Sequence, residues 1–345
     1  MAWSEDSIGS FYNYLPKGCE ICRIGASLVL FVTGKCGRSC FYCPLSEERK
    51  GKDLAFADEQ PVEDIEDIIN EAKAIGALGT GITGGEPLLK LDQVLEYIRA
   101  LKRSFGPEHH IHLYTGLLPE RDVLMKLKAA GLDEIRFHPP YPEWPDPRGL
   151  KEALEEAKSL GLEAGVEIPA IAPAPEIINA VRDADAFMNI NELEFSETNA
   201  DQLKSQGYKP EEIHCGAIGS ERIAREHFMP EGVKVHYCPS RFKDAVQLRE
   251  RFKRRCERIA RPFDIPTEDG TLICGTICGN IGSALAVLVE LHVPEEMYSL
   301  KRNEIEISAP ILEDISKKLK SIGCIVSLIE RYPLEDGLVV ERIPL

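Results

Sequence analysis

Residues 27–43, SLVLFVTGKCGRSCFYC, join an apolar strand-like run to three closely spaced cysteines. Cys36, Cys40 and Cys43 follow this run directly, and the next cysteine downstream is Cys215. Three thiolates at this spacing can bind three irons of a cubane cluster, which leaves the fourth iron open to a small molecule. Zinc is the alternative, since CxxC pairs often bind it, but zinc sites usually add a second pair of ligands. The tight triplet therefore favours iron–sulfur.

Strand-like and helical segments alternate around this motif. Apolar residues recur with helical spacing in 62–75, where Pro61 suits the first turn of the predicted helix, and again in 150–160. The alternation predicts an α/β fold whose parallel sheet is wound by right-handed crossovers into a full or partial barrel. The strand-like runs are 27–34, 80–83, 111–116, 134–140, 164–171 and 190–198.

Polar or glycine-rich groups follow most of these predicted strands. In barrels of this kind the chemistry lies at the C-terminal ends of the strands, so the groups are expected to converge on one mouth. Polar loops also begin at strand ends, and this explains an isolated Thr115 or His138 equally well. The groups are 35–43, Gly84–Gly85–Glu86, Tyr114–Thr115, His138, Glu167 and Ser196–Glu197–Thr198–Asn199.

Two motifs together resemble the radical S-adenosylmethionine (SAM) superfamily. One is CxxxCxxC with Tyr42 before its last cysteine, and the other is Thr83-Gly84-Gly85-Glu86-Pro87 after the second strand. The resemblance covers residues 26–200 and implies a partial (β/α)6 barrel. It also implies a 4Fe–4S cluster on the three cysteines, with SAM chelating its open iron. The implied SAM surroundings are Tyr42, Gly84, Gly85, Glu86, Pro87, Thr115, Glu167 and Ser196.

The resemblance implies an oxidoreductase-type radical enzyme. An electron from a ferredoxin- or flavodoxin-type donor would cleave SAM to a 5′-deoxyadenosyl radical, which abstracts hydrogen from an unidentified substrate. Over its whole length the chain resembles a poorly characterised branch related to pyruvate formate-lyase-activating enzyme. Alternatives are a glycyl-radical-enzyme activase acting on a protein, a tRNA- or rRNA-modifying enzyme, and a non-enzymatic iron–sulfur electron carrier or metal-binding protein.

Further cysteines flank the predicted barrel. Cys19 and Cys22 form a CxxC before it, and Cys215 and Cys238 follow it. Two ligands from each side would complete a set of four for an auxiliary 4Fe–4S cluster or a structural zinc. Cys274–Cys278 is also spaced for ligation and could replace either pair. Buried cysteines without a metal are the alternative, because thiols are common in protein cores.

The charge distribution is uneven. The chain has a formal net charge of −16, yet residues 241–261 hold nine Lys or Arg against three acids. This segment is interpreted as an amphipathic helix with a solvated charged face, or alternatively as a surface that follows RNA phosphates.

The chain is expected to divide into four regions. These are an extension with CxxC (1–25), the barrel (26–200), a helical segment with the basic helix (201–262) and a small α+β appendage (263–345). In the appendage we predict strands at 271–277, 283–291, 303–308, 324–332 and 337–343, with a helix at 311–320.

No apolar run is long enough to span a membrane, and the N-terminus carries acids rather than a signal-peptide pattern. The sequence therefore predicts a cytoplasmic protein without a membrane partner, in which eleven cysteines stay reduced.

Overall fold

The computed structural model describes residues 2–301, 303–334 and 337–345. The chain forms two compact units. One comprises Met1–Lys73 and Ala77–Leu248, and the other comprises Ala74–Gly76 and Arg249–Leu345.

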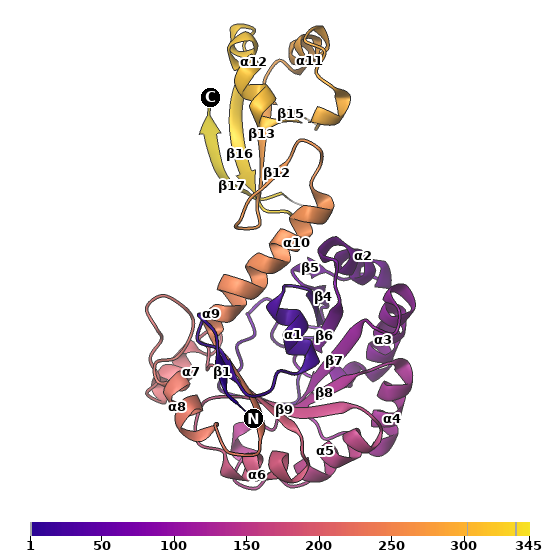
Figure 1. The fold of residues 1–345 in the computed structure, drawn as a ribbon, viewed down its shortest axis with the longest axis vertical. Helices are drawn as coiled ribbons and strands as arrows, with labels where there is room; N and C mark the ends of the chain where they lie inside the picture. The colour runs from indigo at the N-terminus through magenta and orange to yellow at the C-terminus, as the bar shows by residue number, and fades with distance from the viewer. Residues whose placement is uncertain (1, 302, 335–336) are drawn as a thin grey trace. The chain divides into compact units, whose positions relative to one another are not determined.

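The first unit is built on a curved sheet whose central strands are all parallel (Figure 1). The antiparallel strands β4 (Phe56–Ala57) and β5 (Gln60–Pro61) extend one edge, while β2 (Phe11–Tyr12) and β1 (Ser4–Glu5) extend the other. The two edges do not pair within the described residues, so the sheet is a partial barrel, as predicted. In spatial order the parallel strands are β11 (Lys234–Cys238), β10 (Phe187–Asn191), β9 (Glu163–Pro169), β8 (Glu134–Phe137), β7 (His110–Thr115), β6 (Gly79–Thr83) and β3 (Ser27–Phe31).

Six of these strands match the predicted runs, but the last of the six is displaced. Residues 190–198 were expected to be a strand, whereas β10 ends at Asn191 and the chain then turns into an isolated bridge between Glu194 and Gly216. The seventh strand, β11, continues the parallel sheet beyond residue 200, the position at which the sequence prediction ends the barrel.

Helices cover the outer face of this sheet, and the apolar core lies between the two layers. The covering helices are α2 (Ile65–Ile75), α3 (Leu91–Phe105), α4 (Arg121–Ala130), α5 (Leu150–Ser159) and α6 (Pro175–Asp183). Two shorter helices, α7 (Ala200–Ser205) and α8 (Ser220–His227), precede β11.

The predicted start of the first covering helix is wrong. Pro61 lies in β5, and α2 begins four residues later at Ile65. The Asp64 carboxylate explains this start, because it accepts hydrogen bonds from the backbone amides of Glu66 (2.8 Å) and Asp67 (3.2 Å). An aspartate that satisfies the free amides of a first turn fixes where a helix begins.

The inner face of the sheet is covered by a short helix, α1 (Lys17–Arg23), which contacts β3, β6 and β7 (Figure 1). Gly18 lets this helix approach closely. A Cβ atom at that position would lie 2.6 Å from Nδ1 of His112 and 2.7 Å from Nη2 of Arg136. The absence of a side chain at Gly18 therefore decides how deep α1 lies in the barrel.

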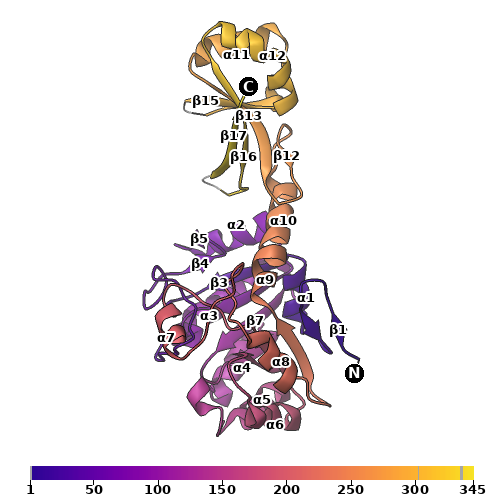
Figure 2. The ribbon, with the colours of Figure 1, turned by 90° about the vertical axis from the view of Figure 1, so that its left-hand side faces the viewer.

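The second unit begins with α10 (Arg249–Ile259), which the prediction assigned to the preceding region 201–262. It continues as an antiparallel sheet with two helices, the α+β arrangement predicted for 263–345 (Figure 2). The strand order is β14 (Tyr298–Leu300), β15 (Glu304–Ile307), β13 (Leu272–Cys278), β16 (Ile325–Arg331) and β17 (Val339–Pro344), and β12 (Ile265–Pro266) pairs with β13. The helices α11 (Ile281–Glu290) and α12 (Ala309–Ser321) share one apolar core with the sheet.

The predicted strand at 283–291 is wrong, because this run forms most of α11. Ala284, Val287 and Leu288 are buried together, and their spacing is that of one helical face. The Asn280 side chain caps this helix by accepting a hydrogen bond from the Ser283 amide at 3.2 Å.

We expect Gly18→Ala to lower the free energy of unfolding by about 1–3 kcal/mol, because the added methyl group must displace His112, Arg136 or α1 itself. Chemical denaturation checks this. Gly282→Ala in α11 is the matched control, since a Cβ there meets no described atom within 4 Å. Equal stability of the two variants would contradict the close packing of α1.

Candidate active site

The three clustered cysteines line one cavity of about 590 Å³ in the first unit, together with the residues of the Gly84–Pro87 turn. Cys36 is exposed, Cys40 and Cys43 are half-buried, and the Cys43 amide donates to the Cys40 carbonyl at 3.1 Å. All eleven cysteines of the chain are described, and none is part of a disulfide.

These thiols fit an iron–sulfur cluster better than a single zinc ion. Among the described residues, no three His, Cys, Asp or Glu side chains already surround a position for one metal ion. A tetrahedral zinc with Zn–S bonds of about 2.3 Å would need its thiolates about 3.8 Å apart. A 4Fe–4S cubane is held by cysteine thiolates, and this loop offers three of them.

The glycine turn is joined to the cysteine loop through its backbone. The Gly85 amide donates to the Thr33 carbonyl at 2.7 Å, and the Glu86 amide donates to the Lys35 carbonyl at 2.9 Å. A Cβ on Gly85 would lie 2.4 Å from the Lys35 oxygen, and one on Gly84 would lie 2.6 Å from the Thr33 oxygen. Only glycine allows the end of β6 to come this close to the segment that carries Cys36.

Hydrogen bonds to the Glu86 carboxylate hold this turn in place. The carboxylate is buried and accepts hydrogen bonds from the Leu88 amide (3.0 Å), the Thr115 hydroxyl (2.8 Å) and the Gly116 amide (2.7 Å). The Thr115 hydroxyl also accepts from the Leu117 amide at 3.0 Å. The geometry therefore gives Glu86 and Thr115 a positioning role at the ends of β6 and β7.

Tyr42 anchors the cysteine loop to the far side of the cavity. Its hydroxyl lies 3.1 Å from Nε2 of His138, and Nδ1 of His138 lies 2.7 Å from the Glu167 carbonyl oxygen. Because a carbonyl only accepts, Nδ1 carries the hydrogen and Nε2 accepts from Tyr42. Burial lowers the pKa of His138, which favours this neutral form.

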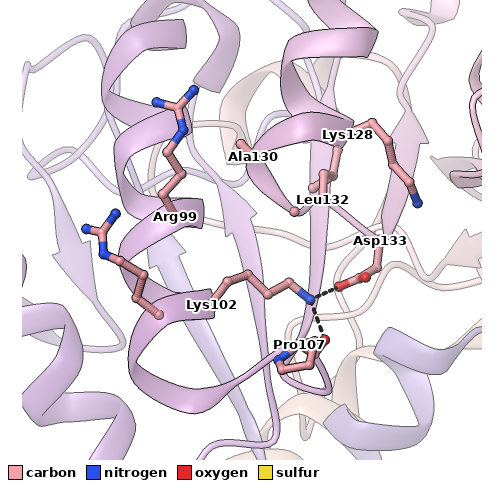
Figure 3. A pocket seen from close by; sticks show the side chains of 9 residues that line it. Arg99, Lys102, Pro107, Lys128, Ala130, Leu132 and Asp133 are labelled. Carbon is pink, nitrogen blue, oxygen red and sulfur yellow. Dashed lines mark hydrogen bonds and ion pairs between the residues drawn. The ribbon is translucent and has the colours of Figure 1, made fainter.

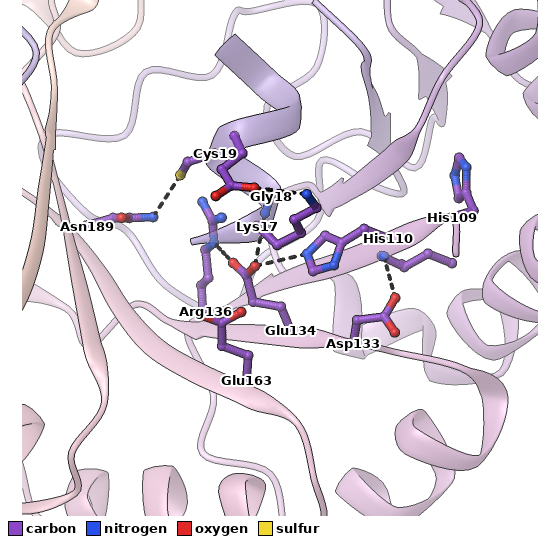
Figure 4. Close-up of polar contacts among 12 residues, drawn as sticks. Lys17, Gly18, Cys19, His109, His110, Asp133, Glu134, Arg136, Glu163 and Asn189 are labelled. Carbon is purple, nitrogen blue, oxygen red and sulfur yellow. Dashed lines mark hydrogen bonds and ion pairs between the residues drawn. The ribbon is translucent and has the colours of Figure 1, made fainter. Parts of the chain in front are cut away.

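A buried network of charges fills the inner wall of the cavity (Figure 4). Arg136 pairs with Glu134 and, at 2.8 Å, with Glu167. The side-chain amides of Asn189 (3.0 Å) and Asn191 (2.8 Å) also donate to Glu167. Burial alone would raise the pKa of both glutamates, but Arg136 reverses this and lowers each pKa below its ordinary value.

The network also holds α1 in place. The Gly18 amide donates to Oε2 of Glu134 at 3.2 Å, and the same oxygen lies 3.0 Å from Nε2 of His110. Glu134 thus connects the first turn of α1 to the charge of Arg136 (Figure 4).

Most of the residues suggested by the sequence line the same cavity. They are Tyr42, Gly84, Gly85, Glu86, Pro87, Thr115 and Glu167, with Cys19, Cys22 and Cys238 of the suggested auxiliary set. Ser196 is not among the lining residues, and its amide donates to the Asn199 side chain at 2.8 Å. Cys215 is also absent from the lining, and its carbonyl accepts from the Phe195 amide.

Sequence reasoning missed the polar wall formed by His112, Arg136, Asn189 and Asn191. The signal was the alternation along two strands, in which every second residue is polar: His110, His112 and Tyr114 in β7, and Glu134 and Arg136 in β8, with His138 directly after it. Barrel interiors are usually filled by branched apolar side chains. Polar residues at those positions therefore indicate a binding site.

A second cavity, of about 510 Å³, is an outer groove at the ends of α3 and α4 (Figure 3). Arg99, Lys102, Arg103 and Lys128 give it a positive lining. The Lys102 ammonium group already has partners within the chain, because it donates to the Asp133 carboxylate at 2.7 Å and to the Pro107 carbonyl at 2.9 Å.

In the part of the chain that the structure describes, no helix is long and apolar enough to cross a membrane.

Comparisons with known proteins identify the family of the chain. The model of the radical SAM superfamily matches residues 30–163, and that of a domain of unknown function (DUF8061) matches residues 270–345. A Methanocaldococcus jannaschii protein named "Putative glycyl-radical enzyme activating enzyme" is 40% identical over 97% of this chain and 94% of its own length.

More distant matches cover only part of the chain. A Methanothermobacter marburgensis protein named "Probable GTP 3′,8-cyclase" is 34% identical over 41% of this chain and 44% of its own length. Among solved structures, methylornithine synthase covers 50% of this chain and 54% of its own, with 15% identity and a TM-score of 0.39.

The chain belongs to the radical SAM superfamily, whose enzymes use a 4Fe–4S cluster and SAM. It is accordingly an enzyme of the oxidoreductase-like radical class.

We expect Glu86→Gln to weaken SAM binding about ten- to a hundredfold, because the amide cannot accept all three hydrogen bonds that hold the turn. Equilibrium dialysis of the cluster-loaded protein checks this. Glu176→Gln, in the exposed first turn of α6, is the control. Unchanged affinity in Glu86→Gln would contradict the positioning role.

We expect Arg136→Met to lower the free energy of unfolding by about 3–5 kcal/mol at pH 7, since Glu134 and Glu167 would remain buried without their cation. In the wild type their lowered pKa values stabilise the fold above the ordinary glutamate pKa, and this contribution is lost as pH falls. The difference between the two proteins should therefore shrink below about pH 4.5, as denaturant titrations across pH will reveal. A pH-independent difference would contradict the charge argument.

Proposed function

We propose that Cys36, Cys40 and Cys43 bind the 4Fe–4S cluster of this enzyme and that SAM lies against the Gly84–Pro87 turn. The observation that carries this proposal is the pair of backbone hydrogen bonds joining the two motifs at the mouth of one cavity. When bound, the cluster and SAM supply a 5′-deoxyadenosyl radical for hydrogen abstraction. The exposure of Cys36 suits electron entry from a ferredoxin- or flavodoxin-type donor.

The residues around this mouth orient the reactants and limit the access of water. Glu86 fixes the turn, and Tyr42 ties the cysteine loop to His138. The Glu167 carboxylate also lines the cavity. The positive charge of Arg136 balances its negative charge, and the side-chain amides of two asparagines donate hydrogen bonds to it. Ser196 is left out of the proposed SAM surroundings, because it does not line the cavity.

As substrate we propose a glycine residue of a partner protein, in a cytoplasmic setting that keeps the thiols reduced. Support comes from the name of the M. jannaschii relative and from the nearly complete length over which the two chains align. The hydrogen atom would leave the glycine α-carbon, and the product would be a protein radical.

The RNA alternative is not adopted, because cations of the basic segment are engaged within their own units. Lys243 pairs with Glu194, and Lys253 pairs with Glu250 at 3.1 Å. Arg255 donates to the Pro333 carbonyl, and Arg261 pairs with Asp264 at 2.8 Å. The segment therefore offers less free positive charge than its sequence suggests.

We expect the anaerobically loaded protein to convert SAM to 5′-deoxyadenosine and methionine with dithionite, and Cys40→Ala to abolish this. Mass spectrometry of both products is the measurement. Cys215→Ala is the control, since Cys215 does not line the cavity. Product formation by Cys40→Ala at the wild-type rate would refute the assigned cluster site.

The substrate is tested with extracts of the source organism grown on α-deuterated glycine. Deuterium should move into 5′-deoxyadenosine, and the extract should gain an electron paramagnetic resonance doublet of a glycyl radical. Transfer that survives protease and stops after ribonuclease would instead identify RNA as the substrate.

A further inference from the structure

The CxxC pair lies on α1, the helix on the inner face of the sheet, whereas the three clustered cysteines lie on the loop after β3. Cys19 and Cys22 are three residues apart in a helix, so they share one face. Both line the central cavity, and Cys238 at the end of β11 lines it as well. Segments more than 200 residues apart in the chain thus bring three thiols to one enclosed space.

A hydrogen bond places Cys19 beside β10, the strand that pairs with β11, and β11 ends at Cys238. The side-chain amide of Asn189 donates to Sγ of Cys19 at 3.4 Å (Figure 4). Asn189 is the register partner of His236, and Asn191 is the register partner of Cys238. His236 and Cys238 are two residues apart on β11, so both point to the inner face of the sheet.

Two cations lie near these buried thiols and oppose the effect of burial on them. Burial raises the pKa of Cys19 to about 12, while the charge of Arg136 opposes that rise. Burial likewise raises the pKa of Cys238, Lys243 opposes the rise, and Cys22 and Cys19 add to it. Arg136 and Lys243 therefore place two positive charges near the thiols, and thiolates that bind a metal carry negative charge.

Two buried polar atoms on the paired strands β10 and β11 have no hydrogen-bond partner among the described residues. They are Oδ1 of Asn189 and Nδ1 of His236, on side chains that are 1% and 4% exposed. Unsatisfied polar atoms inside a protein cost about 1–3 kcal/mol each. Their presence beside three thiols, in a barrel interior that is normally apolar, indicates a space built for a ligand.

We propose that Cys19, Cys22 and Cys238 bind a second 4Fe–4S cluster inside the barrel, separate from the cluster at the mouth. Among the described residues, no three His, Cys, Asp or Glu side chains are already gathered around one ion position. Cysteine thiolates are the usual ligands of a 4Fe–4S cubane, and three of them leave one iron for another ligand. Cys215, which the sequence suggested as a fourth ligand, does not take part, because it lies outside the cavity lining.

The test is a count of metal in protein purified and loaded without oxygen. The wild type should hold about eight irons per chain, since each cubane contains four. A mouth variant, Cys36→Ala with Cys40→Ala and Cys43→Ala, should keep about four irons and a reduced-cluster paramagnetic signal that SAM does not alter. A barrel variant, Cys19→Ala with Cys22→Ala and Cys238→Ala, should keep about four irons and a SAM-sensitive signal.

Cys215→Ala and the buried Cys256→Ala are matched controls, and both should keep the wild-type iron content. About four irons in the wild type, an iron-free mouth variant, or zinc in place of the retained iron would each overturn the proposal. The wild-type count and the mouth variant decide the matter even if the barrel variant does not fold. If the wild type fails to cleave SAM while the mouth variant keeps its iron, the proposed function fails and the second cluster stands.

Discussion

The buried guanidinium of Arg136 is the interaction on which the interior of the barrel depends. It meets Glu134 on its own strand and Glu167 on the next. Through Glu134 it fixes the first turn of α1, and through Glu167 it holds two asparagines of β10. Removing one charge from such a group leaves the others buried without compensation. The fold can therefore keep a polar interior only if all of these residues are present together.

This interior explains why the cavity and the mouth form one site. The carbonyl of Glu167 also receives the hydrogen bond from His138, which in turn accepts one from Tyr42 in the cysteine loop. The cysteine loop is held on its other side by the glycine turn. The cysteine loop is thus held by backbone hydrogen bonds on one side and by the Tyr42–His138–Glu167 hydrogen bonds on the other, so the strands that carry these groups set its position.

The sequence alone predicts the parallel strands and the site at their C-terminal ends, because period and motif are local signals. Cys36, Gly84 and Glu86 can be placed at one mouth without a structure, since parallel strands end on the same side. β11 is missed because a long segment with two short helices separates it from β10. α11 is misread because a short apolar run fits a strand or a helix equally well. The partners of Arg136 are missed for a different reason, as they depend on which strands become neighbours.

The two sets of cysteines differ in surroundings rather than in ligand type. Cys36 faces solvent at the mouth, whereas Cys19 is buried beside Arg136 and Asn189. For clusters with the same thiolate ligands, solvent exposure, nearby charge and hydrogen bonds to sulfur set the reduction potential. Arg136 and Lys243 favour the more negative, reduced form of a cluster held within the barrel, and the amide of Asn189 donates to one of its sulfurs. A second cluster there would consequently accept an electron at a different potential from the first, and the difference would come from the same buried cations that hold the barrel together.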